Sequence, residues 1–573
     1  DMGQSPARPY APNSNLVATL PLDDRSFKRD ELSVRSYAEF KFLKDFTFKV
    51  SANSDITGTY ATTYQNNQLG DAQNVKGRST KSYTRGYSYT ANEILTYNKT
   101  IDDHSIEVMV GHENYSYLSH FLSATRTGYG FPTSELVAGA VGEGSTSYTD
   151  EYSLEGYLSR LSYNYASKYF AQASFRRDGS SRFSKDSRWG NFFSIGGAWV
   201  VSSEEFMAST RNFLNNLKVK VSYGEQGNDD IGNFYGFQSL YTIDDYNNHD
   251  LNGAWYSSLP NEDLKWEKNK NFNTGVEFTV FERFGGELTY FQRSSDNLLF
   301  SVPRPQSTGL SGKWENVGTM VNKGIEVNLN GKIIKTNDFE WNFDFNITHY
   351  KNEITKLPQK EIISGTKKLS VGHSVYDFWL RESAGVDPNT GLQLYYYDDP
   401  TTGEKLTTTN QNNASYYYVG TSIPDFYGGL TTGFKYKWFD ASVLVTYSVG
   451  GEMYDYAYAA LMHGGSYGTH WHTDILNRWH EVGQETDVPK VQNGLTQLTA
   501  QSSRFLTDAS FVNIKNVTIG FTLPKNISSK AGIENARLFV TGDNLKIFSK
   551  RKGMLWIHPF TLREDLTIIT SNK

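Results

Sequence analysis

The sequence contains no cysteine in its 573 residues. Disulfide bonds, zinc–thiolate centres and iron–sulfur clusters all need cysteine, so each of them is excluded. The chain also lacks any run of about 20 apolar residues, which is the length that a membrane-spanning helix requires. A disulfide-stabilised scaffold and a helical membrane protein are therefore both ruled out.

The sequence also lacks an excess of basic over acidic residues. Lys and Arg number 56 against 62 Asp and Glu, which gives a net charge of -6 at pH 7. Nucleic-acid binding draws much of its affinity from an excess of basic groups on phosphates, so no nucleic-acid partner is expected. No H-E-x-x-H motif is present, and no catalytic cofactor is expected. We do not expect an enzyme, although the carboxylate pair of a glycoside hydrolase cannot be recognised from spacing alone.

What the sequence does contain is a strand pattern that continues almost from end to end. Segments of about ten residues alternate apolar and polar side chains, so that each segment has one apolar and one polar face. Residues 46–53 illustrate it, with Phe46, Phe48, Val50 and Ala52 on one face and Thr47, Lys49, Ser51 and Asn53 on the other. About sixteen such segments are recognisable between residues 32 and 548. So many in one chain favour a closed transmembrane barrel, because lipid allows no open sheet edge.

The connections between these segments alternate in length. Short turns at Lys44-Asp45, Ser167-Lys168 and Trp438-Phe439 contrast with long loops such as Gly227 to Leu264 and Val449 to Arg504. Bacterial outer-membrane barrels have short periplasmic turns and long extracellular loops. Aromatic residues make up 15% of the chain, in keeping with the interfacial girdles of such barrels.

The polar face of each strand would line the barrel lumen, with residues such as Lys49, Asn53, Arg160 and Asn164. Two glycines are expected to supply positive φ angles at turns. Gly179 would do so after Asp178, and Gly324 at the end of Asn322-Lys323-Gly324, before the next alternating strand.

An ordered set of segments resembles the SusC-type TonB-dependent outer-membrane transporters (the SusC/RagA family). These segments are Ala173–Phe183, Trp189–Ser194, Leu217–Gly224 with Gly227-Asn228, Leu264–Glu267, Asn322–Glu326, Phe339–Asn352, Phe511–Phe521 and Leu538–Leu545. The resemblance runs from about residue 30 to residue 550. It implies an all-β fold, namely a large part of a 22-stranded transmembrane antiparallel β-barrel.

The resemblance also gives a domain interpretation. Residues 1–573 are expected to form a barrel that is incomplete on its N-terminal side. Within it, residues 1–30 would be loop, 31–550 barrel strands and extracellular loops, and 551–573 an atypical tail. The plug domain of the family, which contacts the TonB complex, is expected to be absent from this chain, together with the first strands.

The family implies import of an oligosaccharide or peptide across the outer membrane of a Gram-negative bacterium. A SusD-like surface lipoprotein would capture the nutrient, TonB would supply the energy through the plug, and outer-membrane lipid would surround the wall. Three alternatives remain: a surface or secreted β-rich glycan-binding protein without transport, a β-rich glycoside hydrolase, and a plain diffusion porin. Solubility without detergent would favour the first, and turnover abolished by a single carboxylate change the second.

Aromatic side chains in the long loops are the candidate substrate contacts, because flat rings stack on sugars and on peptide side chains. We name Trp255, Tyr256, Tyr417 and Trp471, with packing within the loops as the alternative. No metal site is predicted, since nothing of fitting spacing completes the histidine group His463, His470, His472 and His480. Ca²⁺ at Asp387 to Gly391 or at Asp398-Asp399 is weighed against ordinary turns, which use the same residues.

Overall fold

The computed structural model describes residues 16–248, 251–310, 312–465, 469–550 and 561–569. Its main body is one antiparallel sheet of 17 strands. In pairing order the strands are β1 (Asp24–Phe42), β2 (Phe46–Gln65), β3 (Arg78–Ile101), β4 (His104–Tyr129), β5 (Gly139–Tyr165), β6 (Tyr169–Ser180), β7 (Trp189–Val200), β8 (Leu214–Asn228), β11 (Glu267–Val280), β12 (Phe284–Asp296), β15 (Thr319–Lys335), β16 (Phe339–Lys356), β24 (Phe426–Tyr436), β25 (Phe439–Val449), β28 (Phe511–Thr522), β29 (Asn535–Ser549) and β30 (Thr561–Ile569).

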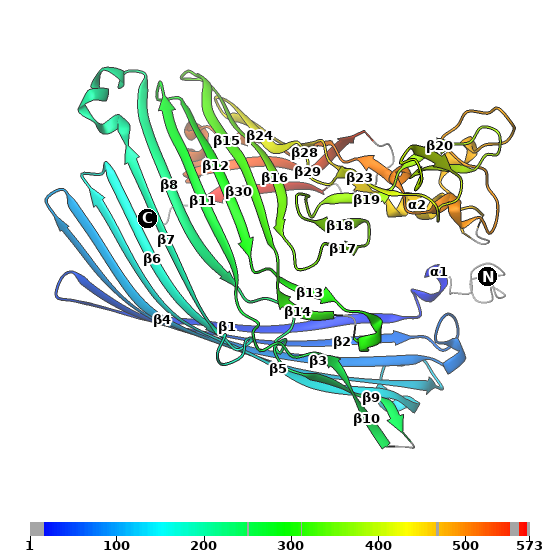
Figure 1. The fold of residues 1–573 in the computed structure, drawn as a ribbon. Helices are drawn as coiled ribbons and strands as arrows, with labels where there is room; N and C mark the ends of the chain where they lie inside the picture. The colour runs from blue at the N-terminus through cyan, green and yellow to red at the C-terminus, as the bar shows by residue number, and fades with distance from the viewer. Residues whose placement is uncertain (1–15, 249–250, 311, 466–468, 551–560, 570–573) are drawn as a thin grey trace.

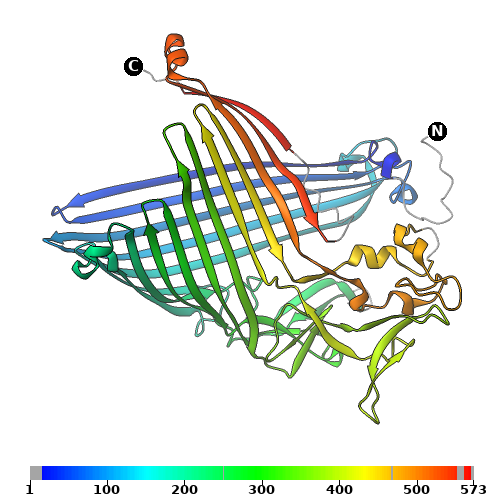
Figure 2. The ribbon, with the colours of Figure 1, turned by 90° about the horizontal axis from the view of Figure 1, so that it is seen from above.

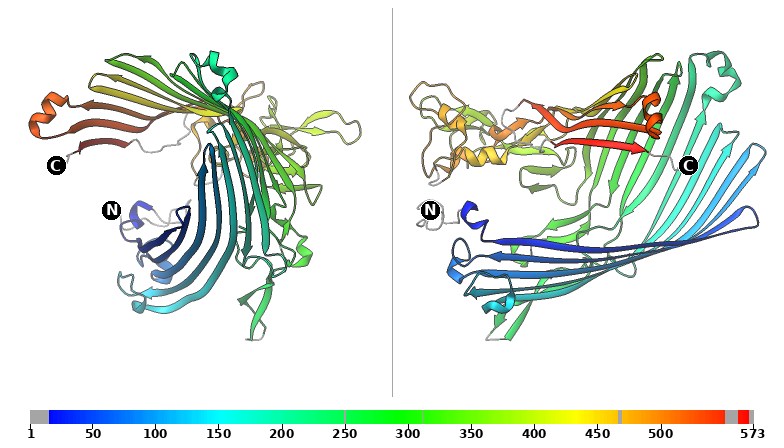
Figure 3. Two further views of the ribbon diagram at one scale, coloured as in Figure 1. Left: turned by 90° about the vertical axis from the view of Figure 1, so that its left-hand side faces the viewer. Right: turned by 180° about the vertical axis from the view of Figure 1, so that it is seen from behind.

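The sheet curls strongly, so that its two edges face each other across an opening (Figures 1 and 3). Strand β1 forms one edge and β30 the other, and among the described residues they do not pair with each other. Every neighbouring pair in the sheet is antiparallel. The all-β prediction is confirmed. No helix in the described part of the chain is both long and apolar enough to cross a membrane.

The strand boundaries correct two of the predictions from sequence. Asp24–Asp30 were predicted to be loop, but they form the first part of β1, whose charged residues along an exposed edge obscure the alternation. Strand β30 lies within residues 551–573, which were expected to be an atypical tail. Its consecutive Arg563, Glu564 and Asp565 obscure the pattern there. Residues 1–15 lie outside the described part of the chain.

The cross-strand register separates an apolar row from a polar row. Direct cross-strand neighbours share a face of the sheet, and a shift by one residue changes the face. One row across five strands consists of Val219, Val276, Leu288, Val327 and Ile347. The adjacent row consists of Lys218, Glu277, Glu287, Asn328 and Asn346. The sheet therefore has one apolar and one polar face throughout this region.

The polar face is the concave one. Polar side chains from strands as distant in the sheet as β3 and β15 line a single hollow, which only the inside of a curled sheet allows. Asn164 is among them. Arg160 is directly opposite Met109, Met109 is opposite Thr96, and Thr96 is opposite Thr47, so all four share one face. Lys49 and Asn53 lie on the same face of β2 as Thr47. The four predicted lumen residues are thus confirmed on the concave face.

Aromatic pairs gather at two levels of the convex face. Near the short turns the pairs, with ring-centroid distances, are Phe46–Tyr97 (4.8 Å), Tyr169–Trp199 (6.3 Å), Trp341–Phe434 (5.5 Å) and Phe439–Phe521 (4.9 Å). Nearer the long loops the pairs are Phe193–Tyr223 (5.8 Å) and Phe272–Tyr290 (6.5 Å). This is the arrangement of interfacial girdles on either side of an apolar band.

Two of the three short turns contain the residues that the sequence suggested, Lys44-Asp45 and Ser167-Lys168, and the third lies one residue earlier than predicted. Leu43 and Lys44 have φ angles of 48° and 63°, and Ala166 and Ser167 have 51° and 56°. In these two turns three residues, 43–45 and 166–168, separate the paired strand ends Phe42–Phe46 and Tyr165–Tyr169, so both are three-residue hairpin loops. The third of these predicted turns is formed by Lys437, with φ of 52°, and Trp438.

The two glycine predictions were wrong, because neither residue has a positive φ angle. Gly179 lies within β6, where a Cβ atom would come 3.0 Å from the ring of Trp189. Gly324 lies within β15, where a Cβ atom would come 2.2 Å from the backbone oxygen of His349. Both glycines serve close packing rather than a turn.

The long loops fold into small units at one end of the trough (Figures 1 and 2). They contain the hairpins β9 (Leu240–Asn248) with β10 (Leu251–Ser258), β13 (Leu299–Pro303) with β14 (Gly312–Asn316), and β26 (Glu452–Tyr454) with β27 (Leu506–Asp508). Two larger sheets comprise β17 (Glu361–Ser364), β18 (Lys367–Ser370), β19 (Asp377–Arg381) and β23 (Tyr416–Thr421), and β20 (Ser383–Val386), β21 (Gln393–Asp398) and β22 (Lys405–Thr408). The α-helices among the described residues are α1 (Leu16–Thr19), α2 (Tyr456–Leu461) and α3 (Lys525–Ser528), of which α2 belongs to these loops.

Candidate functional site

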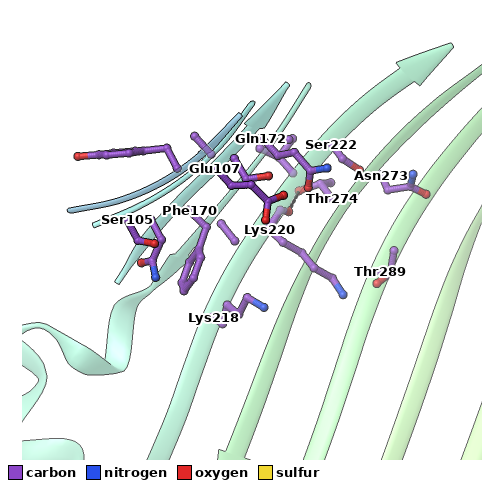
Figure 4. A pocket seen from close by; sticks show the side chains of 18 of the residues that line it. Ser105, Glu107, Phe170, Gln172, Lys218, Lys220, Ser222, Asn273, Thr274 and Thr289 are labelled. Carbon is purple, nitrogen blue, oxygen red and sulfur yellow. Dashed lines mark hydrogen bonds between the residues drawn. The ribbon is translucent and has the colours of Figure 1, made fainter. Parts of the chain in front are cut away.

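A polar hollow of about 690 Å³ lies on the concave wall (Figure 4). It is lined mainly by β4 to β8 and by β11 and β12, and the labelled side chains of Glu107, Gln172 and Lys220 are directed into it from different strands. Its further lining residues include Ser105, Phe170, Lys218, Ser222, Asn273, Thr274 and Thr289. Short polar side chains dominate, so the wall offers many donors and acceptors but no deep enclosed pocket.

A lysine between two carboxylates forms the charged centre of this wall. The Lys220 ammonium group lies 2.8 Å from Glu277 Oε1 and also contacts Glu287, while Lys218 lies 3.6 Å from Glu277. Each of these side chains is about one-third exposed. Ion pairs this accessible contribute only about 0.2–1 kcal/mol, so their partners can be exchanged at little cost.

A second charged group continues toward the long-loop end of the same face. Arg176 donates to both carboxylate oxygens of Asp178, at 2.7 and 2.9 Å, and to Glu113 at 2.7 Å. Above it, Asp229 accepts hydrogen bonds from Ser180 at 2.6 Å and from Tyr152 at 2.8 Å. These bonds connect the loop after β8 to the strands β5 and β6. The same loop is also held by apolar packing. Its residues Ile231 and Leu264 belong to a buried cluster with Phe183, Phe192 and Trp266.

The four aromatic residues predicted from sequence lie in the long-loop units, but they do not converge on one site. Trp255 and Tyr256 belong to β10 and are 52% and 48% exposed, and the ring of Tyr256 lies 4.6 Å from that of Tyr241. Trp471 is 45% exposed, donates from Nε1 to the His463 carbonyl at 3.0 Å, and stacks on that imidazole. The β9–β10 hairpin and the β23 unit occupy different parts of the loop end (Figure 1).

Tyr417, in β23, is held by side chains from β21 and β22. Its hydroxyl donates to Asp398 Oδ1 at 2.7 Å, and the ammonium group of Lys405 lies 4.5 Å from its ring centroid. Partial burial, together with the adjacent Asp398 carboxylate, raises the pKa of Tyr417 to about 12. This hydroxyl therefore stays protonated and acts as a hydrogen-bond donor at any physiological pH.

One group that the sequence reasoning missed is an aromatic and cationic face on the β18–β19–β23 sheet. Lys368 lies 3.7 Å above the Trp379 ring, and Arg381 lies 4.6 Å above that of Tyr416. Tyr418 contacts Trp379 at 4.8 Å and stacks on His373. The alternation in Asp377–Arg381 was the available signal, since Phe378 and Leu380 face a buried core while Trp379 and Arg381 face away from it.

The residues considered for metals make local hydrogen bonds. Asp387 accepts from the Asn389 amide at 3.0 Å and from the Thr390 hydroxyl at 2.6 Å, and these bonds lower the pKa of its carboxyl. Asp399 accepts from the Thr401 amide at 2.7 Å in a similar turn. Within the described ranges no three His, Cys, Asp or Glu side chains gather as a metal site. The turn interpretation accounts for these contacts, and binding of Ca²⁺ stays a prediction.

Comparison with known proteins decides the family. The family of TonB-dependent receptor-like β-barrels matches residues 2–545. The chain belongs to this family. It is 29% identical to TonB-dependent receptor P3 of Formosa agariphila and 28% identical to TonB-dependent receptor SusC of Bacteroides thetaiotaomicron, in each case over 96% of the chain. The solved structure of the RagAB peptide transporter matches 93% of the chain at 28% identity, with a TM-score of 0.84.

The chain spans only part of these relatives: 56% of receptor P3, 55% of SusC and 60% of the matched chain in the RagAB structure. These proteins are named as receptors and transporters rather than enzymes, in agreement with the prediction that this chain is not an enzyme. Family membership places the chain in the outer membrane of a Gram-negative bacterium. The short turns then lie at the periplasmic side and the long loops at the cell surface.

Proposed function

We propose that this chain forms the wall and the surface loops of a SusC-type nutrient importer. The observation that carries the proposal is the division of the 17-stranded sheet into an apolar convex face and a polar concave face with exchangeable ion pairs. An apolar exterior suits lipid, and a polar interior suits a water-filled path for a hydrophilic solute. The similarity to the RagAB peptide transporter supports transport as the activity.

In the proposed mechanism the substrate is an oligosaccharide or a peptide. A SusD-like surface lipoprotein delivers it to the long loops, where exposed rings such as those of Trp255 and Trp471 contact it. The polar wall around Lys220 then guides it inward by exchanging hydrogen bonds with the short polar side chains. TonB supplies the energy by acting on a plug domain within the lumen.

Uptake in live cells tests the proposal. Cells that carry the intact receptor should accumulate labelled oligosaccharide or peptide, and deletion of either TonB or the cognate lipoprotein should abolish accumulation. Accumulation that survives loss of TonB would instead indicate passive diffusion. Surface binding of glycan with no accumulation would favour the alternative function, a glycan-binding β-protein without transport.

The behaviour of this chain alone provides a second test. Because its convex face is apolar, it should require detergent and should not support energy-dependent uptake by itself. A soluble monomer in plain buffer would contradict the membrane wall, because large exposed apolar surfaces associate in water.

A further inference from the structure

The apolar convex face of the β15–β16 hairpin ends at two lysines. Along β15, going away from the short turn, the outward residues are Leu329, Val327, Ile325 and then Lys323. Along β16 in the same direction they are Phe345, Ile347, His349 and then Lys351. Twelve residues of strand separate each lysine from the short-turn end of its strand, at Lys335 or Phe339. With a rise of about 3.3 Å per residue and a tilt of about 40°, the lysines lie roughly 30 Å above that end.

That height is above the lipid-facing apolar band, which is about 25 Å tall in such barrels. The two side chains therefore lie at the level of the outer-leaflet headgroups. Both of them are exposed. They face the lipid side rather than the lumen. Gly324, the residue next to Lys323, faces the concave side, against Phe291 and Tyr350, and adjacent residues of a strand point to opposite faces.

Lys323 and Lys351 are directly opposite each other across the two strands. Directly opposed residues in an antiparallel pair have Cβ atoms about 5 Å apart, and like charges in that position repel each other. Of the lysines in β15 and β16, only Lys332 forms an ion pair among the described residues, with Glu340, so neither Lys323 nor Lys351 has an acidic partner there. The like-charged pair is thus unfavourable for the isolated chain, and an anion between the two groups would remove the repulsion.

The strand neighbours of the two lysines add no further charge beside the pair. On the β12 side, Lys323 is opposite the uncharged Gln292. On the other side, the pairing of β16 with β24 ends at Thr348, so Lys351 has no strand neighbour there. Glu353 lies two residues from Lys351 on the same face of β16 and forms no ion pair with it among the described contacts, and the carboxylate of Asp425 lies against Gly450.

We propose that Lys323 and Lys351 bind the headgroup phosphate of an outer-leaflet lipid, with one ammonium group on each side of the phosphate. Charge-assisted hydrogen bonds from ammonium groups to phosphate oxygens are short and strong, and a phosphate at this height occupies the same layer as the lysines. The site is independent of import: it lies on the opposite face of the wall from the hollow around Lys220.

Lipid binding by the intact receptor, purified in detergent, tests the assignment. Native mass spectrometry would follow the binding of bisphosphorylated lipid A, with dephosphorylated lipid A and inorganic phosphate as comparison probes. Replacement of Lys323 or Lys351 by Gln should weaken lipid A binding about fivefold each, and the double variant should lose the preference for the phosphorylated form. Binding of inorganic phosphate alone, without preference for the lipid, would overturn the lipid assignment.

Lys332→Gln is the matched control. It removes a lysine from the same strand, but near the short turn, where Lys332 pairs with Glu340 at 3.1 Å. This variant should bind lipid A like the wild type. If the double variant and the control bind lipid A equally, the proposal is wrong.

Lys351→Glu distinguishes phosphate binding by the lysine pair from a mere relief of the repulsion between the two lysines. Glu at this position gives Lys323 an attractive partner, so the melting temperature in lipid-free detergent should rise or stay unchanged. The increase in melting temperature that lipid A gives the wild type should then disappear. Retention of that increase in a folded Lys351→Glu protein would exclude the lysine pair as the binding site.

Discussion

The ammonium group of Lys220 on β8 lies 2.8 Å from the Glu277 carboxylate on β11, in the middle of the concave wall. Glu287 on β12 contacts the same ammonium group, so one cation connects three adjacent strands. Because the three side chains are about one-third exposed, the group resembles a solvated surface cluster more than a buried structural ion pair.

Lys220→Gln should therefore change transport more than stability. We expect a loss of at most about 1 kcal/mol in the free energy of unfolding. The maximal rate of uptake should fall, because two neighbouring carboxylates lose their cation and make the wall more acidic. Thermal unfolding in detergent and uptake by cells measure the two effects. The double variant Lys220→Gln with Glu287→Gln restores the local charge and should recover part of the rate.

Gly324 should tolerate no side chain. A Cβ atom there would lie 2.2 Å from the His349 carbonyl oxygen, which belongs to the backbone and cannot rotate away. Gly324→Ala should destabilise the β15–β16 pair by about 1–3 kcal/mol, the usual cost of overpacking. The folded fraction on refolding into detergent measures this effect.

Gly429→Ala is the control, since a Cβ atom at Gly429 would meet nothing closer than 3.4 Å. It should refold with a yield close to that of the wild type. Equal yields for the two variants would show that the β15–β16 pair can separate enough to accommodate a methyl group.

The sequence allowed most of the wall to be predicted, and the reason is visible in single rows. Val219, Val276 and Leu288 lie one residue away from Lys218, Glu277 and Glu287, so the period-two pattern assigns both faces without knowledge of the register. Alternation fails where one face is not apolar. Asp24–Asp30 at the exposed edge in β1 were missed for this reason.

The loops were harder to predict, because their contacts join residues distant in sequence. Lys368, Trp379 and Tyr416 meet on one face only after three short strands pair, and no local pattern specifies that pairing. The roles of Gly179 and Gly324 were also mispredicted because they depend on contacts with residues distant in sequence. A glycine before an alternating segment suggests a turn, whereas its actual role depends on a ring or a carbonyl from the neighbouring strand.

The exposed loop tryptophans should affect substrate affinity without affecting the fold. Trp255→Ala and Trp471→Ala each remove a ring that is about half exposed, so the melting temperature should change by no more than about 2 °C. If the rings contact substrate, the half-saturation concentration for uptake should rise about 3–10-fold, the value of one stacking contact.

Phe206→Ala is the control for this series. Phe206 is 67% exposed, but it lies at the short-turn end, far from the loops. Uptake by this variant should keep the wild-type half-saturation concentration. If the tryptophan variants also keep it, their rings belong to loop packing rather than to substrate recognition.

Lys367 should make the β17–β18–β19–β23 unit more stable at alkaline pH. Its ammonium group lies 3.2 Å above the Phe378 ring and donates to Ser422 Oγ at 2.8 Å, and burial lowers the pKa of Lys367 to about 8. Between pH 8 and the unfolded-state pKa of about 10.4, the unfolded chain binds more protons than the folded one. The free energy of unfolding therefore rises with pH across this window, and Lys367 adds no pH dependence below it.

Hydrogen exchange of the β18 and β19 amides at pH 8 to 10, corrected for intrinsic exchange, measures this effect. Protection in the wild type should increase with pH, and Lys367→Met should remove the increase. Lys368→Met is the matched control, since Lys368 lies on the opposite face of β18 and pairs with Glu361 at 2.9 Å. It should keep the wild-type slope, because the proton released on folding comes from Lys367. Equal slopes in the wild type and Lys367→Met would assign the pH dependence to another group.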